Sequence, residues 1–144
     1  MSDEEYMKIA ILEAKKSLAS DDVPVGAIIV VDDKIIAKSY NQKEKNQKAT
    51  YHAEILAINE ANEKLKSYRL EDAIIYTTKE PCLMCMGAIL SARIKKIVYG
   101  ASDKRYGTKE LANNNNFNHK CDIVGEVCKE ECEELLSNFF KKLR

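Results

Sequence analysis

The order of apolar patterns along the chain constrains its fold more than any other feature of the sequence. A continuous, β-branched run at 25–31 is followed by a polar break and a second apolar segment at 35–40, which predicts a β-hairpin. Farther along, segments with helical spacing of apolar residues alternate with short β-branched runs. Strands separated by helices are typical of crossover units, so the sequence predicts an α/β fold.

The predicted elements cover most of the chain. We expect helices at 4–19, 53–65, 82–92 and 129–142, and strands at 25–31, 35–40, 73–78, 96–100 and 122–127. The polar segments 41–50 and 101–120 are predicted to be loops. Because no linker or repeat divides the 144 residues, a length typical of one domain, we expect a single domain over residues 1–144.

Bulk composition excludes two classes of protein. Lysine and arginine together number 23, as do aspartate and glutamate, so the net charge is zero and a strongly basic nucleic-acid-binding domain is excluded. The apolar run at 23–31 is too short to span a bilayer, so we expect no membrane partner. The acidic first residues lack the positive start and apolar core of a secretory signal, which predicts a cytoplasmic protein.

Two short motifs carry the chemistry. The first reads His52-Ala53-Glu54 and the second Pro81-Cys82-x-x-Cys85, each at the start of a predicted helix. Two cysteines across one helical turn can bind one metal ion, and one imidazole from elsewhere makes three ligands. Three protein ligands leave the fourth tetrahedral position open for water, which is the arrangement of a catalytic zinc site.

Glu54 is the candidate for proton transfer. Zinc lowers the pKa of a bound water to about 7, but deamination also needs a group that moves protons from water to the ring nitrogen and to ammonia. Glu54 lies two residues after His52, and the order His-x-Glu…Pro-Cys-x-x-Cys is the signature of zinc deaminases.

Taken singly, these residues have simpler interpretations. The cysteine pair alone would suit half of a structural zinc site or a redox pair. His52 alone would suit a core position, and Glu54 alone a first-turn charge that complements the helix dipole. Their joint order and spacing favour the deaminase site.

A second group consists of His119, Cys121, Cys128 and Cys132. A metal site can be drawn from it, because Cys128 and Cys132 are four residues apart and share a helix face. We favour buried thiols that act as small hydrophobes, since no tight turn presents paired thiolates.

The chain resembles the bacterial tRNA-specific adenosine deaminases, a branch of the cytidine deaminase-like zinc deaminases, over about residues 5–143. The matching segments are 23–27, 40–41, 52–58, 69–70, 80–88, 92–94, 98–101, 118–119 and 131–140. The zinc motifs are shared with cytidine, guanine and nucleotide deaminases. The Ala-Arg-Ile and Tyr-Gly-Ala segments, the Asn-His pair and the terminal Phe-Phe favour the tRNA branch.

This resemblance implies both a fold and an activity. The fold is three-layered, α/β/α, and cytidine deaminase-like, with a central mixed five-stranded sheet. The activity is zinc-dependent hydrolytic deamination of adenosine to inosine at the wobble position, in the tRNA anticodon loop, by a homodimer with one zinc ion per chain. Two alternatives stay open: a zinc deaminase of a free base, nucleoside or nucleotide of guanine or cytosine type, and a non-catalytic RNA-binding or structural zinc subunit.

The resemblance also implies the site residues. His52, Cys82 and Cys85 hold zinc, and Glu54 transfers protons. The implied substrate-binding residues are Asn41, Ala53, Asp103, Asn118 and Phe140. Asn41 matches the asparagine that contacts the flipped base, although an asparagine after a strand is also typical of a turn. One of the two phenylalanines at 139–140 also fits the core side of an amphipathic helix.

Three departures from the family pattern concern the substrate rather than the metal chemistry. Tyr51 stands where a small residue usually precedes the histidine, Met86 replaces a common alanine, and the segment 106–116 is shorter than usual. Lys43, Lys45 and Lys48, close to Asn41 in the 41–50 loop, give modest support for RNA binding, although lysine-rich loops are also typical of solvated surface.

Overall fold

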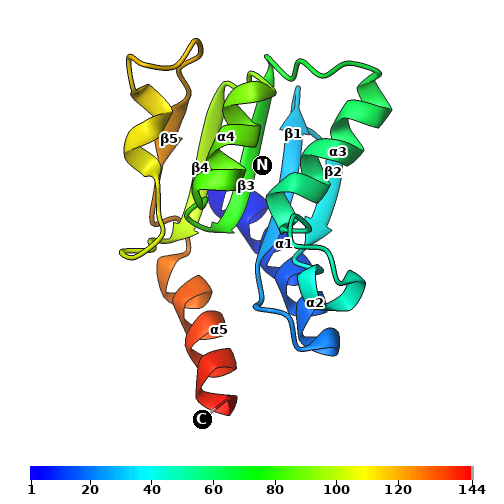
Figure 1. Ribbon diagram of the computed structural model, residues 1–144, viewed down its shortest axis with the longest axis vertical. Coiled ribbons are helices and arrows are strands. Elements are labelled where there is room, and N and C mark those ends of the chain that lie inside the picture. The colour runs from blue at the N-terminus through cyan, green and yellow to red at the C-terminus, as the bar shows by residue number, and fades with distance from the viewer. Residues whose placement is uncertain (144) are drawn as a thin grey trace.

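A mixed five-stranded sheet forms the centre of the fold (Figure 1). The structure is a computed structural model that describes residues 1–143. The strands are β1 (Gly26–Val31), β2 (Lys34–Tyr40), β3 (Ala73–Lys79), β4 (Lys96–Ala101) and β5 (Asp122–Val124), in the spatial order β2-β1-β3-β4-β5. β1 pairs antiparallel with both β2 and β3, whereas β3, β4 and β5 run parallel. The predicted hairpin and the mixed five-stranded sheet are therefore confirmed.

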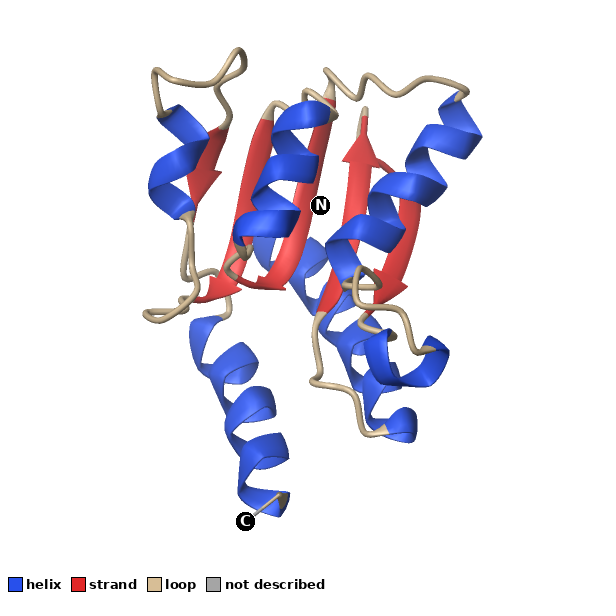
Figure 2. Cartoon of the chain, in the orientation of Figure 1, coloured by secondary structure: helices blue, strands red, loops and turns tan. Residues whose placement is uncertain are grey.

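Helices cover both faces of this sheet (Figure 2). They are α1 (Asp3–Lys15), η1 (Lys16–Ser20), α2 (Lys43–Asn46), α3 (Ala53–Leu65), α4 (Leu83–Ser91), η2 (Lys109–Asn113) and α5 (Lys129–Lys142). α3 and α4 lie side by side on one face, and α1 lies on the other (Figure 2). None of the described helices has the length and apolar character needed to cross a membrane.

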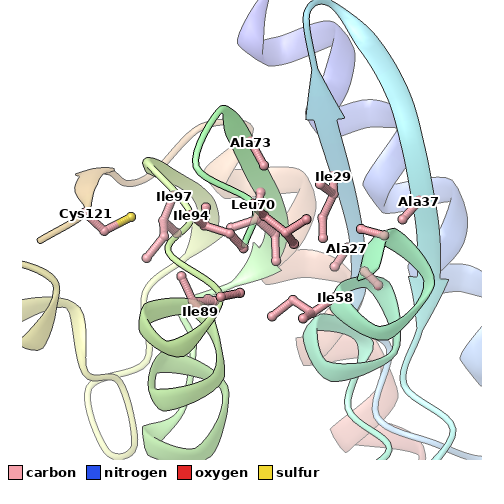
Figure 3. Packing of buried hydrophobic residues seen from close by; sticks show 14 of the residues in the cluster. Ala27, Ile29, Ala37, Ile58, Leu70, Ala73, Ile89, Ile94, Ile97 and Cys121 are labelled. Atoms are coloured by element: carbon pink, nitrogen blue, oxygen red, sulfur yellow. The ribbon is translucent and has the colours of Figure 1, made fainter. Parts of the chain in front are cut away.

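Two hydrophobic clusters join the three layers. Ala27 and Ile29 of β1 point to the α3 and α4 side, where they pack with Ile58 and Ile89 (Figure 3). The alternate residue Ile28 points to the α1 side. This alternation follows from the period of two in a β-strand, and it explains why a strand buried on both faces has a continuous apolar sequence.

Gly26 lets α1 lie directly against β1. A Cβ atom at this position would be 2.1 Å from the Ala10 carbonyl oxygen and 2.5 Å from the Ala14 nitrogen. Both atoms belong to the helix backbone, so they cannot move aside as a side chain would. The glycine is required by this close approach.

Several predicted boundaries differ from the structure. The helix predicted at 4–19 is an α-helix only to Lys15 and ends in the 3₁₀ turn η1, after which Asp21 has a left-handed backbone (φ 56°). The strand predicted at 122–127 ends at Val124, because Glu126 and Cys128 also have positive φ angles and turn the chain out of the sheet. The two predicted loops contain the short helices α2 and η2.

Candidate active site

The metal-binding side chains meet because α3 and α4 begin at the same end of the sheet (Figure 1). His52 is the N-cap residue of α3, and Cys82 is the N-cap residue of α4, with Cys85 one turn into that helix. His52 Nδ1 lies 3.7 Å from Cys82 Sγ and 3.6 Å from Cys85 Sγ. Among residues 1–143 this is the one group of three or more His, Cys, Asp or Glu side chains arranged to hold a metal ion.

The spacing of these three atoms fits a tetrahedral zinc ion. Zinc binds imidazole nitrogen at about 2.0–2.1 Å and thiolate sulfur at about 2.3 Å, so tetrahedral angles place nitrogen and sulfur about 3.6 Å apart. The two observed nitrogen–sulfur distances, 3.6 and 3.7 Å, agree with that value. One imidazole and two sulfurs are also a donor set that zinc prefers.

Hydrogen bonds link the three candidate ligand side chains. A hydrogen bond from Cys85, supported by one from His52, lowers the pKa of Cys82 to about 3. The hydrogen bond to Cys82, together with burial, raises the pKa of Cys85 above its usual range. The hydrogen bond that His52 itself makes to Cys82 raises the pKa of His52. Metal binding requires thiolates and a neutral imidazole, so it releases the protons of Cys85 and His52.

Glu54 is a buried carboxyl group beside this metal group. It is the second residue of α3 and is 4% exposed. Burial raises its pKa above the ordinary value, and the positive charge of His52 opposes that shift. A carboxyl group with a raised pKa is suited to taking up and releasing a proton near neutral pH.

A cavity of about 450 Å³ opens at the metal group. Its walls come from the 41–43 segment, the starts of α3 and α4, the end of β3, the segment after β4 and the end of α5. The lining residues are Val23, Val25, Asn41, Lys43, His52, Ala53, Glu54, Lys79, Glu80, Cys82, Asp103, Tyr106 and Phe140. The structure thus places Asn41, Ala53, Asp103 and Phe140, which the sequence selected as substrate-binding residues, around Glu54.

Asn41 is held by main-chain hydrogen bonds. Its Nδ2 donates to the Val23 carbonyl oxygen at 3.1 Å, and its Oδ1 accepts from the Lys43 nitrogen at 3.2 Å. The hydroxyl of Ser17 donates to the Asn41 carbonyl oxygen. Asn41 therefore stabilises a turn after β2, as its alternative interpretation predicted, and lines the cavity as well.

Asn118 does not lie with the other predicted substrate-binding residues. It lines a second hollow beside α4, together with Leu83, Leu90 and Phe117. The segment that carries Asn118 follows η2 and packs near the end of α4, where His119 Nε2 lies 2.7 Å from the Ile94 carbonyl oxygen. No residue of this hollow is shared with the cavity at Glu54.

The second group of cysteines does not assemble. Cys121 belongs to the hydrophobic cluster on the α3 and α4 face, whereas Cys132 belongs to the cluster on the α1 face. Burial raises the pKa of both thiols to about 12. Cys121 and Cys132 are buried thiols that pack in the core, and the sheet separates them.

Sequence reasoning missed part of the cavity wall. Val23 and Val25 were assigned to the apolar run, and Lys79 and Tyr106 received no role. Lys79 Nζ lies 3.2 Å from Asp103 Oδ2, so the cavity has an ion pair at its rim. Glu80 lines the cavity, and its place directly before the Pro-Cys-x-x-Cys motif is the feature of the sequence that could have indicated this.

Three metal-binding side chains at two helix N-termini, with a buried carboxyl group beside a cavity, define the class of hydrolytic deaminases. The sequence model of the MafB19-like deaminases matches residues 1–144. The chain is 44% identical to a tRNA-specific adenosine deaminase from Bacillus subtilis (strain 168), over 99% of this chain and 91% of the relative. The chain therefore belongs to the deaminase family, within the group of tRNA-specific adenosine deaminases.

Solved structures agree with this assignment. A structure from studies of A-to-I editing by tRNA:A34 deaminases at the wobble position superposes with a TM-score of 0.87 at 36% identity, over 92% of this chain and 99% of the other. A guanine deaminase from Bacillus subtilis superposes with a TM-score of 0.68 at 42% identity, over 71% of this chain and 66% of the other. The three-layer fold is thus that of cytidine deaminase-like enzymes, as predicted.

Proposed function

We propose that this protein deaminates adenosine to inosine at the wobble position of tRNA, in the anticodon loop. The observation that carries the proposal is the group of His52, Cys82 and Cys85 beside buried Glu54, in a chain 44% identical to a tRNA-specific adenosine deaminase. All 144 residues would act as a single catalytic domain in the cytoplasm.

His52, Cys82 and Cys85 would hold one zinc ion per chain, through Nδ1 and the two Sγ atoms. When bound, the ion supplies Lewis acidity that lowers the pKa of a water to about 7. Glu54 accepts a proton from the attacking water at its carboxylate and delivers it to the ring nitrogen; it then takes a second proton from the hydroxyl group now on C6 and delivers it to the amino group, which leaves as ammonia. Its burial supports this role, because a raised pKa lets the same group act as base and then as acid near neutral pH.

The cavity walls suit an unstacked base with its flanking phosphates. Asn41 and the main chain at Ala53 are the groups we propose to contact the base edge, since the Asn41 amide has a second N–H and a second lone pair beyond its bonds to the main chain. Phe140 is 43% exposed at the rim, where an aromatic ring can stack on a flanking base. Lys43 lies at the same rim and can contact phosphate, and Asp103 is held in place by Lys79.

We also propose that the protein is a homodimer whose interface includes the hollow beside α4. This hollow is lined mostly by apolar side chains, and one of them, Leu83, is 68% exposed. Leu83 directly follows the proposed metal ligand Cys82 in the sequence. Asn118 lies in the same hollow. If Asn118 contributes to substrate binding, it would therefore act on the substrate of the partner subunit. Equilibrium sedimentation of wild type and Leu83→Asp tests the proposal; a monomeric wild type would overturn it.

The experiment that tests the function is an inosine assay on full-length tRNA with adenosine at the wobble position, beside free adenosine, cytidine and guanine. We expect inosine in the tRNA and no change in the free compounds. Glu54→Ala should abolish turnover while one zinc ion per chain remains, and Cys85→Ala should lose both zinc and turnover. Glu63→Ala, which removes an exposed carboxylate from the same helix, is the matched control.

A second candidate function is guanine deamination, favoured by the 42% identity to the guanine deaminase of known structure. Turnover of guanine without turnover of tRNA would establish it in place of tRNA editing. Wild-type turnover by Glu54→Ala would overturn the proton-transfer role in either case.

A further inference from the structure

One wall of the cavity is a loop that has little regular structure of its own. The loop spans residues 102–109, from the end of β4 to the first residue of η2, and it contributes Asp103 and Tyr106 to the cavity. Asp103 Oδ1 accepts hydrogen bonds from the Arg105 and Tyr106 nitrogens, each at 3.0 Å. These bonds shape the tip of the loop, but they do not attach it to the rest of the protein.

Besides the ion pair of Asp103 with Lys79, the attachment comes from Glu80, which binds the main chain at both ends of the loop. Glu80 Oε1 accepts a hydrogen bond from the Asp103 nitrogen at 3.0 Å, and Oε2 accepts one from the Lys109 nitrogen at 3.0 Å. Lys109 is the first residue of η2, which has no side-chain cap of its own. Glu80 is 4% exposed, so both bonds are formed away from bulk solvent.

The loop packs so closely on this carboxylate that residue 107 has no room for a side chain. A Cβ atom on Gly107 would lie 2.3 Å from both Cδ and Oε2 of Glu80. The hydroxyl of Thr108 adds a hydrogen bond to the Pro81 carbonyl oxygen at 3.0 Å. Carboxylate and loop backbone therefore form one packed unit.

Glu80 also connects this unit to the metal group. It is two residues before Cys82, and its own nitrogen donates to the Ala101 carbonyl oxygen at 2.8 Å, at the end of β4. The loop wall is thus fixed relative to the same short segment that positions the metal ligand.

We propose that Glu80 is a positioning residue for substrate: its carboxylate holds the 102–109 loop in place as a wall of the cavity. That the substrate is tRNA rests on the proposed function, whereas the attachment of the loop by Glu80 does not. A carboxylate suits this task because it offers two acceptor oxygens to two main-chain donors. An amide offers one oxygen, and its NH₂ group would face the second N–H group.

The test compares Glu80→Gln with Glu110→Gln, a control that removes an exposed carboxylate from η2. Hydrogen exchange of the 102–110 amides, zinc content, and KM and kcat for tRNA are measured on each protein. In Glu80→Gln we expect exchange to be faster by about ten- to a hundredfold, from the loss of one hydrogen bond to a charged group. KM should rise, by no more than the factor by which exchange accelerates, because opening of the loop reduces the binding-competent fraction, while kcat changes by less than about twofold. Zinc should stay at one per chain.

Other results overturn the proposal. Unchanged exchange would show that Glu80 does not hold the loop, and faster exchange with unchanged KM would show that the loop does not position substrate. Gly107→Ala keeps the carboxylate but displaces the loop, so it should reproduce the rise in KM, and it carries the test if Glu80→Gln fails to fold. If the wild type acts on a free base and not on tRNA, the proposed function fails, and KM for that base then tests the loop.

Discussion

The opposite wall of the cavity depends on one buried carboxylate, Asp22, and replacing it with asparagine should release that wall. Asp22 is 1% exposed. Its Oδ1 accepts from the Glu44 nitrogen at 2.6 Å, and its Oδ2 accepts from the Lys45 nitrogen at 3.1 Å and from the Ser20 hydroxyl at 2.6 Å. These bonds hold α2, which follows the cavity residue Asn41 and buries none of its own side chains.

The magnitude follows from the number of acceptors that remain. Asp22→Asn keeps one oxygen and turns an NH₂ group toward the other donors, so at least one charge-assisted bond is lost, at a cost of about 2 kcal/mol. That energy corresponds to about a thirtyfold increase in the fraction of molecules in which α2 is detached. Because α2 contributes nothing to the core, the melting temperature should fall by less than the 4–8 °C that about 2 kcal/mol of global destabilisation would cause.

Hydrogen exchange of the 44–47 amides, read beside the melting temperature, is the assay. Asp21→Asn is the control, because Asp21 is exposed and asparagine tolerates its left-handed backbone. We expect fast exchange and a raised KM for tRNA in Asp22→Asn alone. Exchange at the wild-type rate in Asp22→Asn would refute the argument that this carboxylate holds the segment.

The remaining predictions concern packing and the thiols. Gly26→Ala should lower stability by at least about 3 kcal/mol, the upper part of the range for overpacking, because the new methyl group meets helix backbone; thermal unfolding measures this, and an unchanged melting temperature would contradict it. Phe139→Ala should lower the free energy of unfolding by about 3 kcal/mol, because Phe139 is buried. Phe140→Ala should change it by less than about 1 kcal/mol but raise KM for tRNA, because Phe140 is exposed and lines the cavity. Equal losses of stability in urea titrations would contradict this assignment of Phe139 to the core and Phe140 to the cavity. In the zinc-loaded protein, half-buried Cys128 should react first with a thiol reagent, and chelation should add Cys82 as a second fast thiol; mass mapping that finds Cys82 modified before chelation would rule out its role as a ligand.

Patterns that are local in the sequence predicted most of the fold. The β-branched runs predicted the strands, and the helical spacing of apolar residues predicted the helices, because each element must bury one face. The continuous apolar run at 25–31 indicates a strand that is buried on both faces. The metal group could also be predicted, since His52 and Cys82 each occupy the N-cap of a helix and their motif has fixed internal spacing.

What the sequence did not reveal depends on contacts between distant segments. The helices α2 and η2 exist where carboxylates 22 and 29 residues away in the chain accept N–H groups of their first turn. Such bonds run to main-chain atoms, so no residue type in the loop indicates them. Asn118 was selected by resemblance alone, and resemblance does not say on which side of α4 its segment packs.

Because the carboxylates of Asp22 and Glu80 bind main-chain N–H groups, the backbone path of each loop does not depend on which side chains the bonded residues carry. Asp22 and Glu80 bond to amide nitrogens that every residue except proline possesses. The side chains at positions 44, 45 and 109 can therefore change in charge and size while these bonds, and the cavity outline that they hold, remain. An ancestral deaminase built this way can acquire a new substrate by exchanging the loop side chains that line the cavity, Lys43 and Tyr106, with its metal group untouched, and a protein engineer can follow the same route with libraries confined to these two positions.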